Sequence, residues 1–379
     1  MKKLLNKAFV FITSAILLTT CFFGCTPPDN GGDNPPPAET EIKNVILVIG
    51  DGMGMGHIKA GQLFQDKDVY NFVNWSNTRV DTANATATVT DSAAGGTAIA
   101  TGTLTNNDYV GIAPDGVTEL ETIMDIAKKL NKSTGIVTND VIYGATPASF
   151  SAHSTSRDNV EEIIESQIES SNVDILCGAY SDECADYEYE IEESGYTYCD
   201  NISRVGTELG KHYWSLESFG GADKILPLKD VVEKAIKVLE KDSDGFVLVV
   251  EEAYIDKYSH NKDFTNTAKS VQILNDTVNY ILSWIGNRKD TAVLVTADHD
   301  TCGLDATTEN LPGYTKTTGM SMGDLYYLFQ TSGHTSEKVG LFVYGATPKY
   351  EDFATYKRND LIKNTETYQI LKSLIENKK

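Results

Sequence analysis

Acidic residues and histidines stand beside the apolar runs of this sequence, in four separate loops. The carboxyl ends of parallel strands meet at one edge of a sheet, so these loops are expected to converge there. Carboxylate and imidazole groups together suit Zn²⁺ and related divalent cations. Taken singly, Asp51 could cap a turn or a helix, and His299 could be a core histidine. Asp256 and His260 could be an exposed helical pair. The candidate ligands are Asp51, Glu251, Asp256, His260, Asp298, His299 and His334.

A serine and an arginine add groups suited to an anion such as phosphate. Ser92 precedes small residues that can begin a helix, where free backbone N–H groups favour a bound anion. A simple helix N-cap by Asp91 or Ser92 is the alternative interpretation. Arg157 ends a Ser- and Thr-rich segment, and its guanidinium could hold two phosphoryl oxygens. Alone, it would be one more surface arginine.

Strand and helix signals alternate from Lys43 onward. Apolar runs predict strands at 44–49, 136–137, 173–176, 246–250, 292–295 and 339–344. Helical periodicity predicts helices at 159–170, 232–239, 271–281 and around 370–374. Thr118 and Glu121 form a capping box that predicts the start of one more helix. The alternation predicts an α/β fold, with a mostly parallel central sheet and helices on both faces.

Six segments resemble the alkaline phosphatase family, in the right order from about Asn44 to Ala346. Each segment is short, but six of them in the same order as in the family make the resemblance specific. The resemblance implies that family's fold and a metal-dependent hydrolysis of phosphate monoesters. The segments are Asn44–Gly54 (NVILVIGDGMG), Val89–Ala94 (VTDSAA), Ala145–Arg157 (ATPASFSAHSTSR), Val250–His260 (VEEAYIDKYSH), Thr296–His299 (TADH) and Gly333–Thr335 (GHT).

The same resemblance assigns roles to individual residues. Ser92 is then the nucleophile that forms a phosphoserine, and Arg157, oriented by Asp91, clamps the phosphoryl group. His153 is interpreted as structural, and Lys257 as at most a water-mediated phosphate contact. Two Zn²⁺ ions are implied. The implied ligands are Asp256, His260 and His334 for one ion, and Asp51, Asp298, His299 and the Ser92 oxygen for the other.

A third, magnesium site is implied with one ligand missing. Thr146 and Glu251, with Asp51 shared, match the family's ligands for this site. Gly144 departs from the pattern, because the family usually has an Asp or a His at this place. We therefore expect a weakened Mg²⁺ site, unless another carboxylate such as Asp140 fills the gap.

Three other functions compete with a phosphomonoesterase. A phosphodiesterase of the same superfamily would use the same two metals. A surface lipoprotein that binds phosphate or metal without turnover is the second alternative, although it would not need Ser92. A sulfatase is disfavoured, because its nucleophile lies in a C/S-x-P-x-R context and Ala-Ala-Gly follows Ser92.

The amino terminus has the form of an export signal. Three lysines precede the apolar run 8–18, which is too short for a confident membrane span. Gly24 and Cys25 resemble a bacterial lipoprotein processing site; an ordinary cleaved signal is the alternative. We expect a signal peptide at 1–24, a tether at 25–42 and a catalytic domain at 43–379. The protein would be exported, either lipid-anchored at the outer face of the bacterial membrane or secreted or periplasmic.

The net charge of the chain limits the classes of partner that it can bind. Its 379 residues include 54 acidic and 32 basic ones, and removal of the three signal lysines changes the formal charge from −22 to −25. Such a surface repels nucleic acid and anionic lipid headgroups, so only a lipid anchor would hold it to a membrane. The sequence leaves a homodimer open. Cys177, Cys184 and Cys199 could form a disulfide or stay as free buried thiols.

Overall fold

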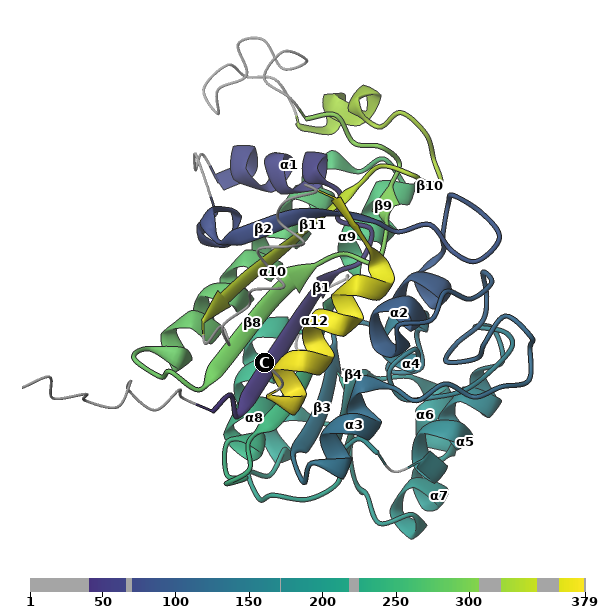
Figure 1. Cartoon of the computed structure of the whole chain (residues 1–379), viewed down its shortest axis with the longest axis vertical. Helices are drawn as coiled ribbons and strands as arrows, with labels where there is room; N and C mark the ends of the chain where they lie inside the picture. The colour runs from purple at the N-terminus through teal and green to yellow at the C-terminus, as the bar shows by residue number, and fades with distance from the viewer. Residues whose placement is uncertain are drawn as a thin grey trace, which may run out of the picture. The chain divides into compact units, whose positions relative to one another are not determined.

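A ten-stranded sheet is the frame of this protein (Figure 1). The structure is a computed structural model that describes residues 41–65, 70–170, 172–217, 225–306, 322–345 and 361–377. The expected signal peptide, Cys25 and nearly all of the expected tether lie outside the described residues. In spatial order the strands are β12 (Leu361–Lys363), β2 (Ser76–Asp81), β11 (Val339–Gly345), β8 (Thr291–Thr296), β1 (Asn44–Gly50), β7 (Phe246–Glu252), β3 (Ser133–Thr138), β4 (Ile175–Ala179), β6 (His212–Leu216) and β5 (Thr197–Cys199).

The sheet is mostly parallel, which confirms the prediction. Strand β11 runs antiparallel to β8 and β2, and the other neighbouring strands of this sheet are parallel. Strand β1 lies between β7 and β8 with every residue buried, as expected for apolar side chains on both faces. Ile49 is paired with Glu251 on one side and with Thr296 on the other. The residues that follow these three strands therefore emerge at the same edge, here called the site edge.

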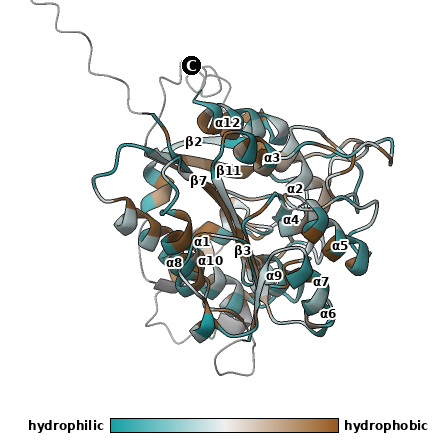
Figure 2. Ribbon diagram, turned by 90° about the horizontal axis from the view of Figure 1, so that it is seen from below, coloured by the Kyte–Doolittle hydropathy of each residue, from teal (hydrophilic) through white to brown (hydrophobic). Residues whose placement is uncertain are grey.

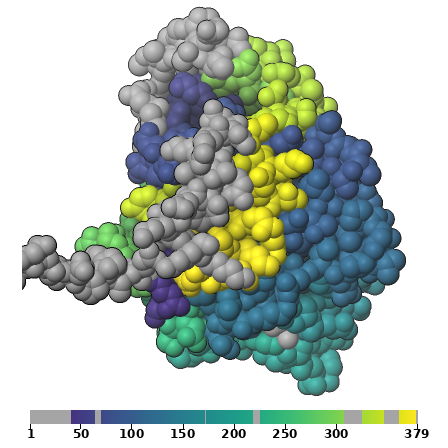
Figure 3. All heavy atoms as spheres, viewed as in Figure 1, coloured from purple at the N-terminus to yellow at the C-terminus, as the bar shows by residue number. Residues whose placement is uncertain are grey.

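Helices cover both faces of the sheet, as predicted (Figures 1 and 2). One face carries α1 (Met55–Gln65), α8 (Leu228–Leu239) and α10 (Phe264–Ile285), and the other carries α2 (Ser92–Thr101), α3 (Ile123–Lys129) and α12 (Asn364–Glu376). In the space-filling view, α12 forms a yellow stripe beside the blue atoms of the first half of the chain (Figure 3). Hydrophobic side chains of the central strands fill the space between the two layers of helices.

Short elements complete the site edge. Strands β9 (Asp300–Thr301) and β10 (His334–Thr335) pair antiparallel and set His334 opposite Thr301. This pairing brings a histidine from late in the chain to the end of β8. The other short elements are α4 (Ala145–Ala148), α5 (Val160–Ser170), α6 (Asp182–Asp186), α7 (Glu188–Glu193), α9 (Tyr254–His260), and the 3₁₀ turns η1 (Asn71–Asn74), η2 (Ile202–Arg204) and η3 (Met322–Leu328).

Two predicted boundaries are wrong. The capping box of α3 is formed by Thr122 and Asp125, not by Thr118 and Glu121. The Thr118 hydroxyl donates instead to Asp115, which holds this segment in a turn, so the helix begins only where its apolar face can be buried. The strand expected at 173–176 is displaced along the chain to β4.

The cysteines Cys177, Cys184 and Cys199 are buried free thiols, so the disulfide considered for them does not form in this structure. Cys184 Sγ lies 3.3 Å from the Tyr213 hydroxyl and packs in the main core. Among the described helices, none combines the length and the apolar composition needed to cross a membrane.

Candidate active site

Two clusters of possible metal ligands lie at the site edge. Within each cluster, ligand atoms of the three residues lie within 4.8 Å of one another. The inner cluster follows β1 and β8 and is fully buried, whereas the outer cluster comes from α9 and β10 and is partly exposed. Figure 1 shows α9, β9 and β10 gathered near the carboxyl end of β1. The inner cluster is Asp51, Asp298 and His299; the outer cluster is Asp256, His260 and His334. The structure thus brings together both ligand sets expected from the sequence.

The inner cluster is arranged around one imidazole nitrogen. His299 Nε2 lies 3.3 Å from Asp51 Oδ1 and 3.5 Å from Asp298 Oδ2. The other oxygen of Asp298 accepts hydrogen bonds from the backbone N–H groups of Gly52 and His299, each 3.1 Å long. Asp51 Oδ1 is buried and accepts no hydrogen bond from any described residue. A buried carboxylate oxygen without a donor is costly, and a cation would satisfy it.

The outer cluster is built around Asp256. Its Oδ1 lies 3.3 Å from His260 Nε2 and 3.5 Å from His334 Nε2. Each imidazole is oriented through its other nitrogen: His260 Nδ1 lies 2.8 Å from the Ser332 carbonyl, and His334 Nδ1 lies 2.9 Å from the Thr90 carbonyl. A carbonyl can only accept, so Nδ1 donates and Nε2 points into the cluster. Loss of the proton on Nε2 would then leave each imidazole in the tautomer that a metal ligand needs.

The two clusters are adjacent and strongly charged. The rings of His299 and His334 stack with their centroids 3.7 Å apart. Burial raises the pKa of Asp298 to about 7, and burial with the neighbouring Asp298 raises that of Asp51. Burial opposes ionisation of Asp256, but hydrogen bonds from the outer histidines outweigh it and hold its pKa well below the usual range. Burial lowers the pKa of His299, which keeps its ring neutral. Contact with Asp256 raises the pKa of His260 and, against the effect of burial, that of His334, so metal binding would release protons from these two rings. Carboxylates crowded around imidazole nitrogens form a donor set that fits divalent cations such as Zn²⁺.

Ser92 lies beside the inner cluster at the start of α2. Its Oγ is 3.1 Å from His299 Nε2, and its side chain is buried. The N-cap of α2 is Asp91, whose carboxylate accepts from the Ala94 N–H at 2.9 Å. A Cβ at Gly95 would lie 2.7 Å from the Asp298 carbonyl oxygen. The small residues after Ser92 therefore let α2 approach the loop that carries the inner cluster.

Arg157 reaches the same place from the loop before α5. Its Nη1 lies 3.5 Å from Asp91 Oδ2, which also accepts from the Asp108 N–H at 2.9 Å. One third of the Arg157 side chain is exposed. Asp91 thus caps α2 and holds the guanidinium near Ser92, while leaving it accessible to an anion from solvent.

A third group of oxygen ligands lies behind the inner cluster. The Thr146 hydroxyl, on α4, is 3.5 Å from Asp298 Oδ2 and also hydrogen-bonds Glu251. Glu251, at the end of β7, accepts a short hydrogen bond from Thr138, and burial raises its pKa to about 7. Gly144 is the N-cap residue of α4, with a φ of −55° that any residue can adopt. The backbone at position 144 therefore does not require glycine.

Sequence reasoning missed Thr301 and His57. The Thr301 hydroxyl donates to Asp256 at 2.5 Å and lies 3.3 Å from His299 Nδ1, so it links the two clusters. His57 is fully buried and accepts from the Gly54 N–H at 3.0 Å, which supports the loop after Asp51. The only available signal was their closeness in sequence to the motif residues.

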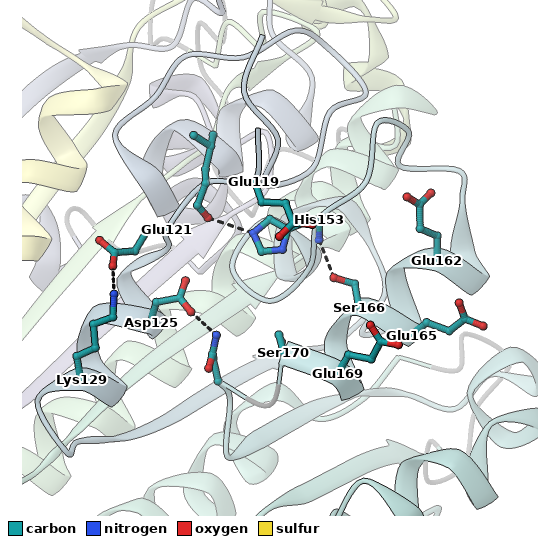
Figure 4. A pocket seen from close by; sticks show the side chains of 12 residues that line it. Glu119, Glu121, Asp125, Lys129, His153, Glu162, Glu165, Ser166, Glu169 and Ser170 are labelled. Atoms are coloured by element: carbon teal, nitrogen blue, oxygen red, sulfur yellow. Dashed lines mark hydrogen bonds and ion pairs between the residues drawn. The ribbon is translucent and has the colours of Figure 1, made fainter. Parts of the chain in front are cut away.

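His153 lies away from both clusters, in an acidic pocket of about 680 Å³ (Figure 4). Its ring nitrogen Nε2 is 3.1 Å from the Leu120 carbonyl, and its backbone N–H donates to the Ser166 hydroxyl at 2.9 Å. These contacts agree with the interpretation of His153 as a structural residue. The pocket repels phosphate esters, since most of its charged groups are carboxylates: Glu119, Glu121, Asp125, Glu162, Glu165 and Glu169.

Comparison with known sequences points to one family. The model of the alkaline phosphatase family matches residues 42–191 and 166–372. The chain is 30% identical over 331 residues to alkaline phosphatase 3 of Bacillus subtilis strain 168, which covers 80% of this chain and 71% of that protein. It is 31% identical over 294 residues to alkaline phosphatase 4 of the same strain. That match covers 70% of this chain and 63% of the relative, so the chain spans less than two thirds of it.

Solved structures agree with the sequence comparison. A mutant alkaline phosphatase from TAB5 with Mg bound superposes with a TM-score of 0.74 at 26% identity, covering 89% of this chain and 99% of that one. The alkaline phosphatase of the Antarctic bacterium TAB5 itself has the same TM-score and coverage at 25% identity.

Proposed function

The chain belongs to the alkaline phosphatase family, and from this membership we propose that it hydrolyses phosphate monoesters through a phosphoserine on Ser92. The observation that carries the proposal is the position of Ser92. Its Oγ lies 3.1 Å from His299, within the inner cluster, with the Arg157 guanidinium held nearby by Asp91. A protein that only binds phosphate or metal has no need for a buried hydroxyl at this point.

The two clusters would each hold one Zn²⁺. Asp256, His260 and His334 would bind one ion, and the inner cluster would bind the other together with Ser92 Oγ. When bound, the two ions supply positive charge beside the nucleophilic and leaving oxygens. Asp51, Thr146 and Glu251 would bind Mg²⁺ at the third group, because carboxylate and hydroxyl oxygens suit this harder cation.

The protein's own groups then divide the reaction into two displacements. Ser92 Oγ, at the positive end of α2, gives up its proton to solvent and attacks the phosphorus atom in line with the leaving oxygen. The P–O bond to the alcohol breaks, and the leaving oxygen takes a proton from solvent. Arg157 donates two N–H groups to the non-bridging oxygens and stabilises their charge in the transition state. A water molecule then attacks the phosphoserine from the vacated side and loses a proton, the P–O bond to Ser92 Oγ breaks, and Oγ is reprotonated as phosphate leaves.

Export and anchoring remain proposals from the sequence. Cleavage before Cys25 would give a lipoprotein held by acyl chains at the outer face of the membrane, with 25–42 as a flexible spacer. Secretion or periplasmic location without an anchor is the alternative. The partners would be small phosphate monoesters, without nucleic acid and with a homodimer as an option.

Turnover of two chromogenic esters tests the function. A monoesterase cleaves p-nitrophenyl phosphate much faster than bis-p-nitrophenyl phosphate, and a diesterase of the same superfamily does the reverse. A non-catalytic binder cleaves neither, even after zinc is restored to the purified protein. Equal or greater turnover of the diester would refute the proposed substrate class.

A further inference from the structure

His57 lies where three segments of the site edge meet, although it belongs to neither cluster. It is the third residue of α1, and its side chain is fully buried. Its ring contacts the loop that follows Asp51, the strand β9 through Asp300, and the helix α9 through Ser259. The ring therefore spans segments that carry or adjoin the ligands of both clusters, and the two displacements proposed above do not use it.

The hydrogen bonds of His57 run in one direction, from the inner-cluster loop to α9. The Gly54 N–H can only donate, so Nδ1, 3.0 Å away, accepts and the ring proton lies on Nε2. Nε2 lies 3.1 Å from Ser259 Oγ and donates to it. That hydroxyl in turn donates to the Ile255 carbonyl at 2.6 Å. A chain of three hydrogen bonds, here called the His57 relay, therefore joins the inner-cluster loop to the backbone of α9.

Close packing fixes both ends of the His57 relay against the strands β9 and β10. A Cβ at Gly54 would overlap Asp300 Oδ1, so the inner-cluster loop is in tight contact with β9. The other oxygen of Asp300 accepts from the Thr335 hydroxyl of β10 at 2.6 Å. At the α9 end, the Ser259 carbonyl accepts from the thiol of Cys302, the residue after β9, at 3.2 Å. A shift at either end of the relay would therefore be transmitted to the strand pair that carries His334.

We propose that His57 is a positioning residue that holds the inner and outer clusters at the spacing that two metal ions need, and that it acts through the His57 relay. Among the described residues, neither His57 nor Ser259 forms a hydrogen bond with a ligand side chain. Breaking the relay therefore leaves every ligand in place and changes only how one cluster lies relative to the other. The inference rests on the proposed function, in which both ions act on one phosphoryl group and the transition state depends on their separation.

Zinc affinity and turnover of the full-length protein are the test. We expect His57→Leu, which removes both hydrogen bonds of the ring, to raise the Kd of the more weakly held Zn²⁺ about tenfold or more in competition with a chromophoric chelator. At saturating zinc it should lower kcat for p-nitrophenyl phosphate at least about tenfold, with KM within about twofold. His57→Gln places an amide N–H near the position of Nε2 and should recover most of both losses. His212→Leu is the matched control, because this buried histidine donates to the Glu208 carbonyl at the amino end of β6, at the opposite edge of the sheet, and both zinc Kd and kcat should stay within twofold.

Ser259→Ala separates the relay from the packing of the ring. It removes the acceptor of Nε2 and leaves the imidazole in place, so it should weaken zinc binding to within about threefold of His57→Leu. The double variant should lose no more than His57→Leu alone, because both substitutions break the same chain of hydrogen bonds.

Three results would overturn the proposal and leave His57 a packing residue: wild-type zinc affinity in Ser259→Ala, additive losses in the double variant, or a His57→Gln protein as impaired as His57→Leu. If His57→Leu does not fold, Ser259→Ala and His57→Gln carry the same test. Zinc affinity is measured without substrate. Absence of turnover by the wild type would therefore refute the phosphatase assignment alone, whereas unchanged zinc affinity in the variants would refute the relay alone.

Discussion

Removing the Thr301 hydroxyl tests whether one residue fixes the geometry of both clusters. Thr301 lies in β9, and its N–H donates to the Gly52 carbonyl at 3.0 Å. Its hydroxyl donates to Asp256 at 2.5 Å and lies 3.3 Å from His299 Nδ1. Thr301→Val keeps the shape and the strand pairing but deletes the donor. Asp256 then keeps its charge with one fewer hydrogen bond, and the His299 ring loses a neighbour that orients it.

The expected magnitude follows from the charge on Asp256. A hydrogen bond to a charged group contributes about 1.5–3 kcal/mol, and groups that orient metal ligands typically change metal affinity about 10- to 100-fold. Because Thr301 is fully buried, water cannot readily replace the lost donor. We therefore expect Thr301→Val to weaken binding of the more weakly held Zn²⁺ by about 10- to 100-fold, and to lower kcat/KM at limiting zinc.

Competition with a chromophoric chelator measures zinc affinity directly. Thr277→Val is the matched control, because this buried hydroxyl donates only to the Ile273 carbonyl within α10 at 2.9 Å. Both variants remove one hydroxyl from the interior, and only one of them lies at the site edge. A Thr301→Val protein that binds zinc within twofold of the wild type would refute the reasoning. An equal loss of zinc affinity in both variants would show that the substitution acts through the stability of the protein rather than through the site.

Four other outcomes are expected. Ser92→Ala should lower turnover of p-nitrophenyl phosphate by at least about a thousandfold with zinc content unchanged; activity within about tenfold of wild type would remove Ser92 from its role. EDTA should abolish activity and Zn²⁺ restore it, and His334→Ala should lower zinc content and activity together, as metal analysis would show. In metal-free protein, Asp298 and Glu251 have pKa values raised to about 7, so their contribution to stability is full below about pH 4 and is lost as pH rises through 7. Thermal unfolding in EDTA should therefore occur at lower temperature at roughly pH 9 than at roughly pH 5, with the difference reduced when zinc is bound. Cys25→Ala should release the protein from membranes, and an unchanged membrane fraction would contradict the proposed anchor.

The parts of the fold that the sequence predicts are those with a simple physical pattern. An uninterrupted apolar run such as 44–49 can be covered only between other elements, and this places it at the centre of a parallel sheet. Once 44–49, 246–250 and 292–295 are neighbouring strands, their following residues must meet at one edge. The convergence of the ligand loops is thus a consequence of topology and could be predicted.

The parts that could not be predicted depend on backbone positions or on space. The carbonyl groups of Thr90 and Ser332 orient two histidines, and a carbonyl leaves no mark in the sequence. The start of α3 depends on which donors each carboxylate meets in the folded loop: Asp115 accepts from Thr118 in a turn, and Asp125 accepts from the Thr122 N–H. The sequence could identify Asp140 as a possible substitute for a side chain at Gly144, but it could not give the distance between the two positions.

The charge of the site explains why a strongly acidic chain could accept an anionic substrate only when metal is bound. Asp51, Asp256 and Asp298 carry three negative charges when ionised, and the positive charge of Arg157 is paired with the carboxylate of Asp91. Without ions, a phosphate dianion would meet a local charge of the same sign as the overall charge of −22. Two divalent cations would add four positive charges against these three negative ones, so the local sign reverses while the surrounding surface stays acidic. The carboxylates that would repel phosphate are therefore the groups that recruit the ions needed to attract it, and phosphate binding should disappear with the metals even if Arg157 and Ser92 remain in place.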